Sequence, residues 1–258
     1  MSEVSVVTPR GVCLSGTLID PENKNGSIVI FVHDFLSERS GGHRYDVMAS
    51  MFRHANYSTL QFDFSGVGES EDDIITLASE IEDLRAISAW VHQKGYENQF
   101  FIATSFGGLV TLSSELDRAT SFIVIDPMFS SLNYEWEKIF PAEQLEQLSQ
   151  KGTTKIYDDS HTSRKYFMIS KQTLVDLSMT DVDSIFEGLT CPILIMLTDY
   201  DCENASEVFN DFNEKYFSKL PDGSKLDVIR VQNENPKAMS EALAENAISW
   251  CDLRLKLI

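Results

Sequence analysis

The sequence predicts an α/β protein built on a mostly parallel, doubly wound sheet. Short apolar runs rich in β-branched and aromatic residues, such as "SIVIFVH" at Ser27 to His33, are typical of strands buried on both faces of a sheet. These runs alternate with amphipathic helical patterns, and that alternation is typical of a parallel sheet flanked by helices. The length of 258 residues suits one large domain of this class or two small ones.

The first half of the chain contains five expected strands and two helices. The turn Pro9-Arg10-Gly11 predicts an antiparallel edge hairpin within Val4 to Pro21. The long helix is indicated by an apolar stripe that includes Leu77 and Leu84 at helical spacing. After the hairpin, the expected elements are a strand at Ser27 to His33, a helix from Tyr45 to Asn56, a strand at Tyr57 to Phe64, the helix from about Thr76 to Lys94, and a strand at Gln99 to Ser105.

The next expected strand is "SFIVIDP", and after it the pattern of alternating strands and helices is interrupted. Residues 128–188 carry aromatic and acidic residues and short helical fragments, with no strong strand. A segment this long is not a plain loop, and we expect it to form a cap or lid above the carboxyl ends of the strands, where open α/β sheets bind ligands. Residues 1–127 and 189–258 would then form the core. The later expected elements are a strand at Cys191 to Asp199, a helix from about Ala205 to Lys219, a strand at Lys225 to Gln232, and a final helix from Pro236.

Composition and charge narrow the classes of partner. The formal net charge of −19 argues against nucleic acids and anionic membranes as main partners, because both select basic surfaces. The four cysteines are scattered, without metal-ligand spacing, so we expect reduced thiols and neither a metal nor a cofactor. The amino terminus lacks the apolar segment of a signal peptide, and no apolar run is long enough to span a membrane. A cytoplasmic location is therefore expected.

A candidate nucleophile follows the strand at Gln99 to Ser105. The sequence Ala103-Thr104-Ser105-Phe106-Gly107 has the form G-x-S-x-G with alanine in place of the first glycine. Small residues are needed at both ends because the turn brings the strand and helix backbones close together. A helix that begins near Phe106 would direct its first N–H groups toward a developing oxyanion. Ser105 is thus the predicted nucleophile.

With this turn and three further segments, the chain resembles the α/β-hydrolase superfamily. His33-Asp34-Phe35 resembles the segment that usually reads His-Gly and then an apolar residue; "FDFSGVGES" resembles the D-x-R-G-x-G-x-S turn; and "CPILIMLTDYD" resembles the strand that delivers the catalytic acid. The resemblance covers almost the whole chain, and it is strongest to small feruloyl- or cinnamoyl-esterase and acylglycerol-lipase-like enzymes with an inserted cap.

This resemblance implies roles for individual residues. The backbone N–H groups of Phe35 and Phe106 would form the oxyanion hole, and Asp201 would be the catalytic acid, favoured over Asp199. Two positions depart from the pattern. Ser65 replaces the usual arginine, and Asp34 replaces the usual glycine, where its carboxylate would either repel an oxyanion or point into solvent.

A histidine is missing where this family supplies the general base. The expected loop, Val231 to Met239, contains none, and the last histidine of the chain is His161. A serine hydroxyl is a weak nucleophile without a base within hydrogen-bond reach. His161 in the cap and Glu234 in the loop are the candidate substitutes. The remaining histidines have structural or surface roles in this interpretation: His33, His43, His54 and His92.

Three functions are compatible with these residues. The first is hydrolysis of a carboxylic ester or thioester through Ser105, with His161 or Glu234 as base and Asp201 in support. The second is a catalytically silent fold that binds a small acyl or aromatic ligand, or a protein partner. The third is a lyase or cyclase that uses the pocket for positioning. Aromatic residues of the cap suit either a ligand pocket or the cap's own core: Phe129, Tyr134, Trp136, Phe140, Tyr157, Tyr166 and Phe167.

Overall fold

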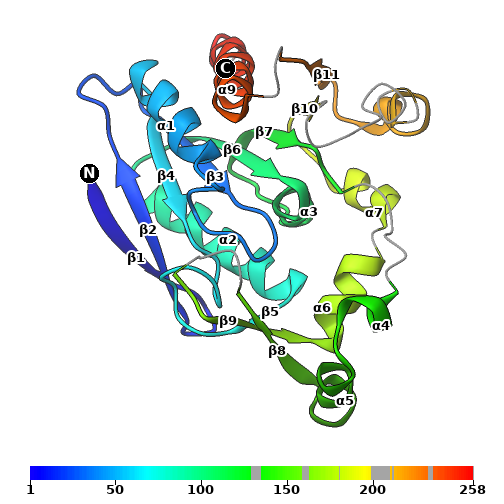
Figure 1. Cartoon of the computed structure of the whole chain (residues 1–258). Coiled ribbons are helices and arrows are strands. Elements are labelled where there is room, and N and C mark those ends of the chain that lie inside the picture. The colour runs from blue at the N-terminus through cyan, green and yellow to red at the C-terminus, as the bar shows by residue number, and fades with distance from the viewer. Residues whose placement is uncertain are drawn as a thin grey trace.

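Within the described residues, eight strands form a central twisted sheet (Figure 1). The computed structural model describes residues 1–128, 135–158, 163–179, 181–198, 210, 212–231 and 235–257. In spatial order the strands are β1 (Ser2–Val7), β2 (Cys13–Ile19), β4 (Ser58–Phe62), β3 (Ser27–Val32), β6 (Asn98–Thr104), β7 (Ala119–Ile125), β10 (Ile193–Thr198) and β11 (Lys225–Ile229). The pairs β1/β2 and β2/β4 are antiparallel, and every other pair is parallel. The predicted edge hairpin and parallel sheet are confirmed.

The strand sequences explain why helices cover both faces of this sheet. Every residue of β3, β4 and β10 is buried, so alternate side chains of these strands pack on opposite faces. Val29 and Phe31 of β3 pack with α1 (Arg44–His54) and α9 (Pro236–Leu255) on one face. Ile28 and Ile30 face α2 (Leu77–Gln93) and α3 (Ser105–Ser113) on the other.

A second, three-stranded sheet lies below the main sheet in the view of Figure 1. It joins β5 (Ile74–Ile75), β9 (Tyr166–Ser170) and β8 (Thr153–Tyr157), with β5 parallel to β9 and β8 antiparallel to it. The expectation of no strong strand in 128–188 is therefore wrong. Both strands are partly exposed and contain Lys155 and two tyrosines, so their sequences lack the continuous apolar run of a central strand. The helices of this segment are α4 (Trp136–Ile139), α5 (Ala142–Lys151), α6 (Lys171–Ser178) and α7 (Val182–Glu187).

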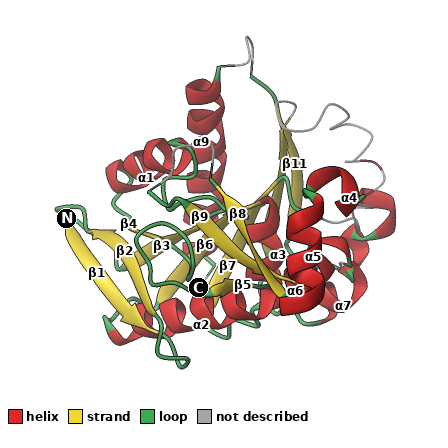
Figure 2. Ribbon diagram, turned by 60° about the horizontal axis from the view of Figure 1, so that its bottom comes forward, coloured by secondary structure: helices red, strands yellow, loops and turns green. Residues whose placement is uncertain are grey.

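Figure 2 shows β8 and β9 of this segment in front of the main sheet. Polar contacts attach the segment to α2 and to the loop that precedes it. Arg164 donates from Nε to the carbonyl oxygen of Gly68 at 2.9 Å and pairs with the carboxylate of Asp72. On α6, Asp176 accepts a hydrogen bond from the backbone N–H of Leu77 at 2.8 Å. The inserted segment is thus held just before β9 and at α6.

The remaining expectations concern the last third of the chain. Of the helix expected over 205–219, the structure describes residues 210 and 212–219; residues 210 and 212–215 are helical, and the short 3-10 helix Phe217–Lys219 follows them. The final helix is confirmed as α9, whose N-cap Asn235 accepts hydrogen bonds from the N–H groups of Lys237 and Ala238. Cys13, Cys191 and Cys251 are free thiols. Among the described residues, no helix is long and apolar enough to cross a membrane.

Candidate active site

Ser105 lies on a sharp turn between β6 and α3. Its φ of 47° is in the left-handed region, which residues other than glycine rarely adopt. The turn needs Gly107, because a Cβ at that position would lie 2.3 Å from the carbonyl oxygen of His33. Ala103, at the other small position, is fully buried in β6. The local geometry is therefore that of a strained strand-to-helix turn with a serine at its tip.

The backbone N–H groups of Phe35 and Phe106, called the amide pair below, converge on one atom. That atom is Oδ1 of Asp34, at 2.7 Å from the Phe35 nitrogen and 3.0 Å from the Phe106 nitrogen. The structure thus brings together the two donors that we expect to form an oxyanion hole, and a carboxylate of the same chain occupies them. Of the two orientations expected for Asp34, the one that points into solvent is wrong. Its pairing with the N–H of Phe106 is what turns it inward.

The Asp34 carboxylate is poorly compensated in this position. Burial raises its pKa, and hydrogen bonds from the amide pair and from the Ser105 side chain oppose that rise only in part. Among the described residues, no cation forms an ion pair with it; the neighbouring Arg39 pairs with Glu3, Asp63 and Glu69 instead. A carboxyl group of this chain therefore lies where a hydrolase of this fold would stabilise an oxyanion during reaction.

His33 supports this loop and is not available as a base. Its Nε2 accepts a hydrogen bond from the N–H of Phe64 at 3.1 Å, so Nε2 carries no proton. The proton is on Nδ1, which donates to the carbonyl oxygen of Asp34 at 2.9 Å. Burial lowers the pKa of His33, in keeping with a neutral ring. Through these two hydrogen bonds the His33 ring fixes the backbone at Asp34, next to Phe35 of the amide pair, and at Phe64.

The other candidate bases and acids divide into two groups. His43 is exposed at the start of α1 beside Asp46, and His54 and His92 are exposed near helix ends, as expected for surface residues. The predicted substitute bases His161 and Glu234, and the predicted acids Asp199 and Asp201, lie outside the described residues. Their roles remain predictions.

Asp126 is a residue of this region that the sequence-based assignment missed. It follows β7 with a φ of 44°, and its carboxylate accepts hydrogen bonds from the N–H and the hydroxyl of Thr198, each at 2.7 Å. The signal was present in "SFIVIDP", since an acid at the carboxyl end of a parallel strand faces the ligand-binding edge of such a sheet. Asp126 links the ends of β7 and β10 beside Ser105.

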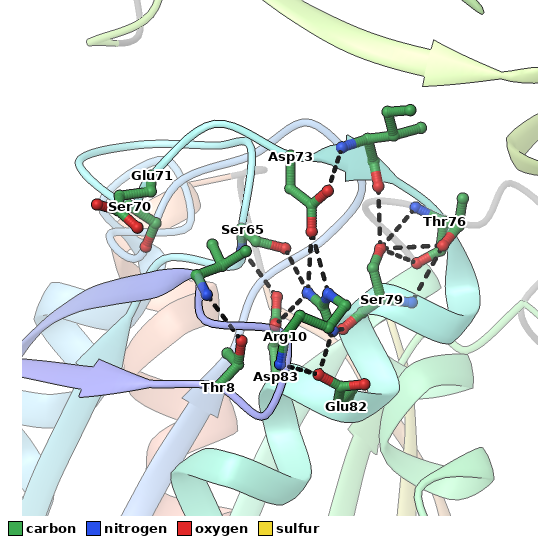
Figure 3. Close-up of polar contacts among 12 residues, drawn as sticks. Thr8, Arg10, Ser65, Ser70, Glu71, Asp73, Thr76, Ser79, Glu82 and Asp83 are labelled. Atoms are coloured by element: carbon green, nitrogen blue, oxygen red, sulfur yellow. Dashed lines mark hydrogen bonds and ion pairs between the residues drawn. The ribbon is translucent and has the colours of Figure 1, made fainter.

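The guanidinium group of Arg10 lies beside Ser65, although the two residues are far apart in the sequence (Figure 3). The sequence has serine where the resembling family has arginine, and Arg10 of the β1–β2 turn donates to Ser65 Oγ at 3.2 Å. The same Arg10 nitrogen is 2.8 Å from Oδ1 of Asp83, whose Oδ2 accepts from the Ser65 N–H. Asp73 and Glu82 complete the group. Arg10 gave no sequence signal, because it meets these residues only in the folded chain.

Among the cavities lined by described residues, two open beside Ser105, and Asp34 lines both. The large cavity, about 610 Å³, lies between the core and the inserted segment. The small cavity, about 430 Å³, includes Arg44, Thr104 and Asp126. The described lining of the large cavity is almost wholly apolar: Phe35, Leu36, Met128, Trp136, Ile139, Phe140, Ile156, Tyr157, Ile169, Leu174 and Leu177, with Asp34, Ser105 and Gln144 as the other members. Of the aromatic residues expected there, Trp136, Phe140 and Tyr157 line it, whereas Phe167 belongs to the buried core. Within the described residues, no group of three or more potential ligands is placed to hold a metal ion.

Comparison with solved structures identifies the fold. No protein-family model matches the chain. No curated protein sequence matches it either. Three structures align along nearly the whole chain: DcsB in complex with its substrate analogue (TM-score 0.74, 15% identity, 98% of each chain), the α/β hydrolase GrgF from Penicillium sp. sh18 (TM-score 0.75, 15% identity, 98% of each chain), and Est1E from Butyrivibrio proteoclasticus with ferulic acid bound (TM-score 0.69, 18% identity, 95% of this chain and 98% of that one). The chain has the α/β-hydrolase fold, and its structural neighbours include hydrolases and esterases of that fold.

Proposed function

We propose that this protein is a ligand-binding member of the α/β-hydrolase fold in which ordinary ester hydrolysis is blocked. The observation that carries the proposal is the Asp34 carboxylate on the amide pair, at 2.7 and 3.0 Å. In hydrolysis, donors at about 2.7–3.1 Å must receive the oxyanion of the tetrahedral intermediate. Here both donors are engaged, and the negative charge beside them would repel that oxyanion.

The expected cost to catalysis is large. Loss of a single oxyanion donor lowers kcat by about 10²–10³. Loss of a triad member in a serine protease removes about 10⁶ in turnover. This chain has no histidine after His161 and none in the loop that should supply the base. The two departures act on the same step, so we expect negligible turnover of simple esters.

The large cavity supports the binding half of the proposal. Its volume of about 610 Å³ lies in the usual range for small-molecule sites, and its walls are apolar with few polar groups. We propose that residues 128–188 act as its cap, since Trp136 and Leu174 from that segment face Phe35 and Ser105 from the core across it. Est1E was solved with ferulic acid bound, and a small aromatic or acyl compound is the corresponding ligand class here.

A reactive Ser105 is the second candidate, and one observation favours it. The serine keeps the strained φ of 47°, which is otherwise costly to maintain. In this alternative a base outside the described residues, His161 or Glu234, activates the hydroxyl toward a carboxylic ester or thioester, with Asp201 in support.

Two measurements on the same preparations test the proposal. A fluorophosphonate probe should not label the wild type above the background given by Ser105→Ala; rapid labelling lost in that variant would overturn the silent assignment in favour of the second candidate. Nile red, a neutral apolar dye, should bind one site. Leu174→Trp, which fills the large cavity, should weaken that binding at least tenfold. The matched control Leu253→Trp, on the exposed side of α9, should leave it unchanged. Equal binding by both tryptophan variants would exclude the cavity as the site.

A further inference from the structure

The large cavity is an apolar chamber with one charged side chain in its described wall. Apart from Asp34, the described lining consists of apolar residues, Ser105, Gln144 and the phenol of Tyr157, and it includes no Lys, Arg or His. In this described wall, an anionic ligand would thus meet a carboxylate and no cation. A cationic ligand would meet a carboxylate and, within the same described residues, no competing positive charge.

Three hydrogen bonds to the Asp34 carboxylate, from the amide pair and from the Ser105 side chain, leave it able to accept a further donor from a ligand, because an ionised carboxylate has about four acceptor sites. Both members of the amide pair donate to Oδ1. Within the described residues, no backbone N–H donates to Oδ2. The amide pair holds the carboxylate in place but supplies no full positive charge to balance it.

The aromatic walls suit the same kind of ligand. Phe35, Trp136, Phe140 and Tyr157 surround the cavity, and Trp136 stacks on Phe140 at a centroid distance of 5.8 Å. Aromatic faces attract ammonium groups and also pack against an apolar tail. The net charge of −19 adds a long-range potential that concentrates small cations near the protein.

We propose that the ligand of this cavity is a small organic cation, an ammonium group on an aryl or alkyl tail, with its N–H groups donating to the Asp34 carboxylate. The inference rests on the proposed function, since it names the ligand class of the same site. It reverses the charge preference of the region: a position that stabilises anions in a hydrolase selects a cation here.

The test compares three probes with the same aromatic tail and different head groups: 3-phenylpropylammonium, 3-phenylpropan-1-ol and 3-phenylpropanoate. Calorimetry at pH 7 on the wild type should give an ammonium Kd at least tenfold below that of the alcohol, with the carboxylate weakest. In Asp34→Asn, which keeps the shape of the side chain, the ammonium and alcohol should bind within about twofold of each other. Asp117→Asn removes an equal charge from an exposed loop and should preserve the wild-type ratio.

The outcomes separate this inference from the proposed function. If the alcohol or the carboxylate binds as tightly as the ammonium in the wild type, or if no probe displaces bound Nile red, the cation assignment is wrong, while the dye shows whether the cavity binds ligands at all. If the ammonium preference survives in a folded Asp34→Asn, Asp34 is not its source. If Nile red itself fails to bind in the cavity, the proposed function fails as well. The wild-type comparison needs no variant to fold.

Discussion

Glu80 on α2 is a buried acidic residue. Within the described residues, the side chain forms no hydrogen bond or ion pair, and it is 2% exposed. Burial raises the pKa of Glu80 well above its ordinary value, and the nearby carboxylates of Asp83, Asp34 and Asp176 raise it further. The native state therefore binds this proton at a pH where the unfolded chain has released it.

From this proton we predict a pH-dependent gain in stability for Glu80→Gln. Because the native pKa is the higher one, the free energy of unfolding of the wild type falls as pH rises through the native pKa. Glu80→Gln removes that loss and should raise the free energy of unfolding at pH 8 by roughly 1 kcal/mol or more, with a difference near zero at pH 4. Urea denaturation at both pH values measures it. Glu97→Gln, at an exposed position, is the control and should leave the free energy of unfolding unchanged at both pH 4 and pH 8. An equal gain in that free energy for Glu80→Gln at the two pH values would contradict the mechanism.

Gly107 gives a second prediction at the scale of one residue. A methyl group there would lie 2.3 Å from the His33 carbonyl oxygen and 2.8 Å from that of Val32, and both are backbone atoms that cannot move alone. Gly107→Ala should therefore destabilise the fold by about 3 kcal/mol or more. Gly188→Ala, whose nearest neighbour would be 3.8 Å away, should change stability by less than about 0.5 kcal/mol. Thermal unfolding of the pair checks this, and similar melting temperatures would refute the close approach of β3 to α3.

At the scale of elements, Arg10 ties the β1–β2 hairpin to α2 and to the loop before it. Its partner Asp83 has a fully buried side chain, whereas Arg10 itself is 27% exposed. Arg10→Met leaves that buried carboxylate without its counter-charge, which costs about 3–5 kcal/mol for a fully buried pair and less here because solvent reaches the guanidinium. We expect a loss of about 2 kcal/mol, measured by chemical denaturation.

The control for Arg10 is another arginine of the same region. Arg85→Met breaks the pair with Glu115 at a solvent-exposed position, and it should cost less than about 1 kcal/mol. Asp83→Asn should recover part of the stability in the Arg10→Met background, because it removes the unpaired charge. If Arg10→Met and Arg85→Met proved equally mild, Arg10 would not be the support for this loop.

At the scale of the whole molecule, the inserted segment meets the core through the pairing of β9 with β5 and through side-chain contacts, of which Arg164 makes several. Arg164 binds the carbonyl oxygens of Gly68 and Ser70 and the carboxylate of Asp72. We expect Arg164→Met to speed hydrogen exchange in β8 and β9 at least several-fold while exchange in β3 and β6 stays unchanged. Arg118→Met, in an exposed loop, should alter neither region. Faster exchange throughout the main sheet would mean instead that the segment is part of one cooperative unit.

The sequence predicts the fold well because a buried strand can be recognised from the apolar residues of its own short segment. Continuous apolar runs mark β3, β6, β7 and β10, and the small residues around Ser105 mark the turn. The strands β8 and β9 were missed because each is half exposed and their pattern resembles that of a loop.

The site was less predictable because its decisive contacts join distant positions. The Asp34 carboxylate accepts a hydrogen bond from the N–H of Phe106, which lies 72 positions further along the sequence. Arg10 donates a hydrogen bond to Asp83, 73 positions further along. The sequence shows an aspartate at position 34, where the resemblance leads us to expect glycine. The direction of its side chain, toward the amide pair, depends on the fold. The meeting of Arg10 with Ser65 has no local signature for the same reason.

The inward carboxylate of Asp34 also constrains how esterase activity could be evolved in the laboratory. Asp34→Gly would clear the amide pair but would add no histidine to the loop from Val231 to Met239. Pro236→His would place a histidine in the empty loop and keep the N-cap Asn235, yet the amide pair would still be occupied. Under the proposed function, neither substitution alone restores turnover, so selection that accepts one improvement at a time gains no activity from either. A library that combines both changes is then the direct route to an active variant, and the carboxylate acts as an epistatic barrier between two functions of one fold.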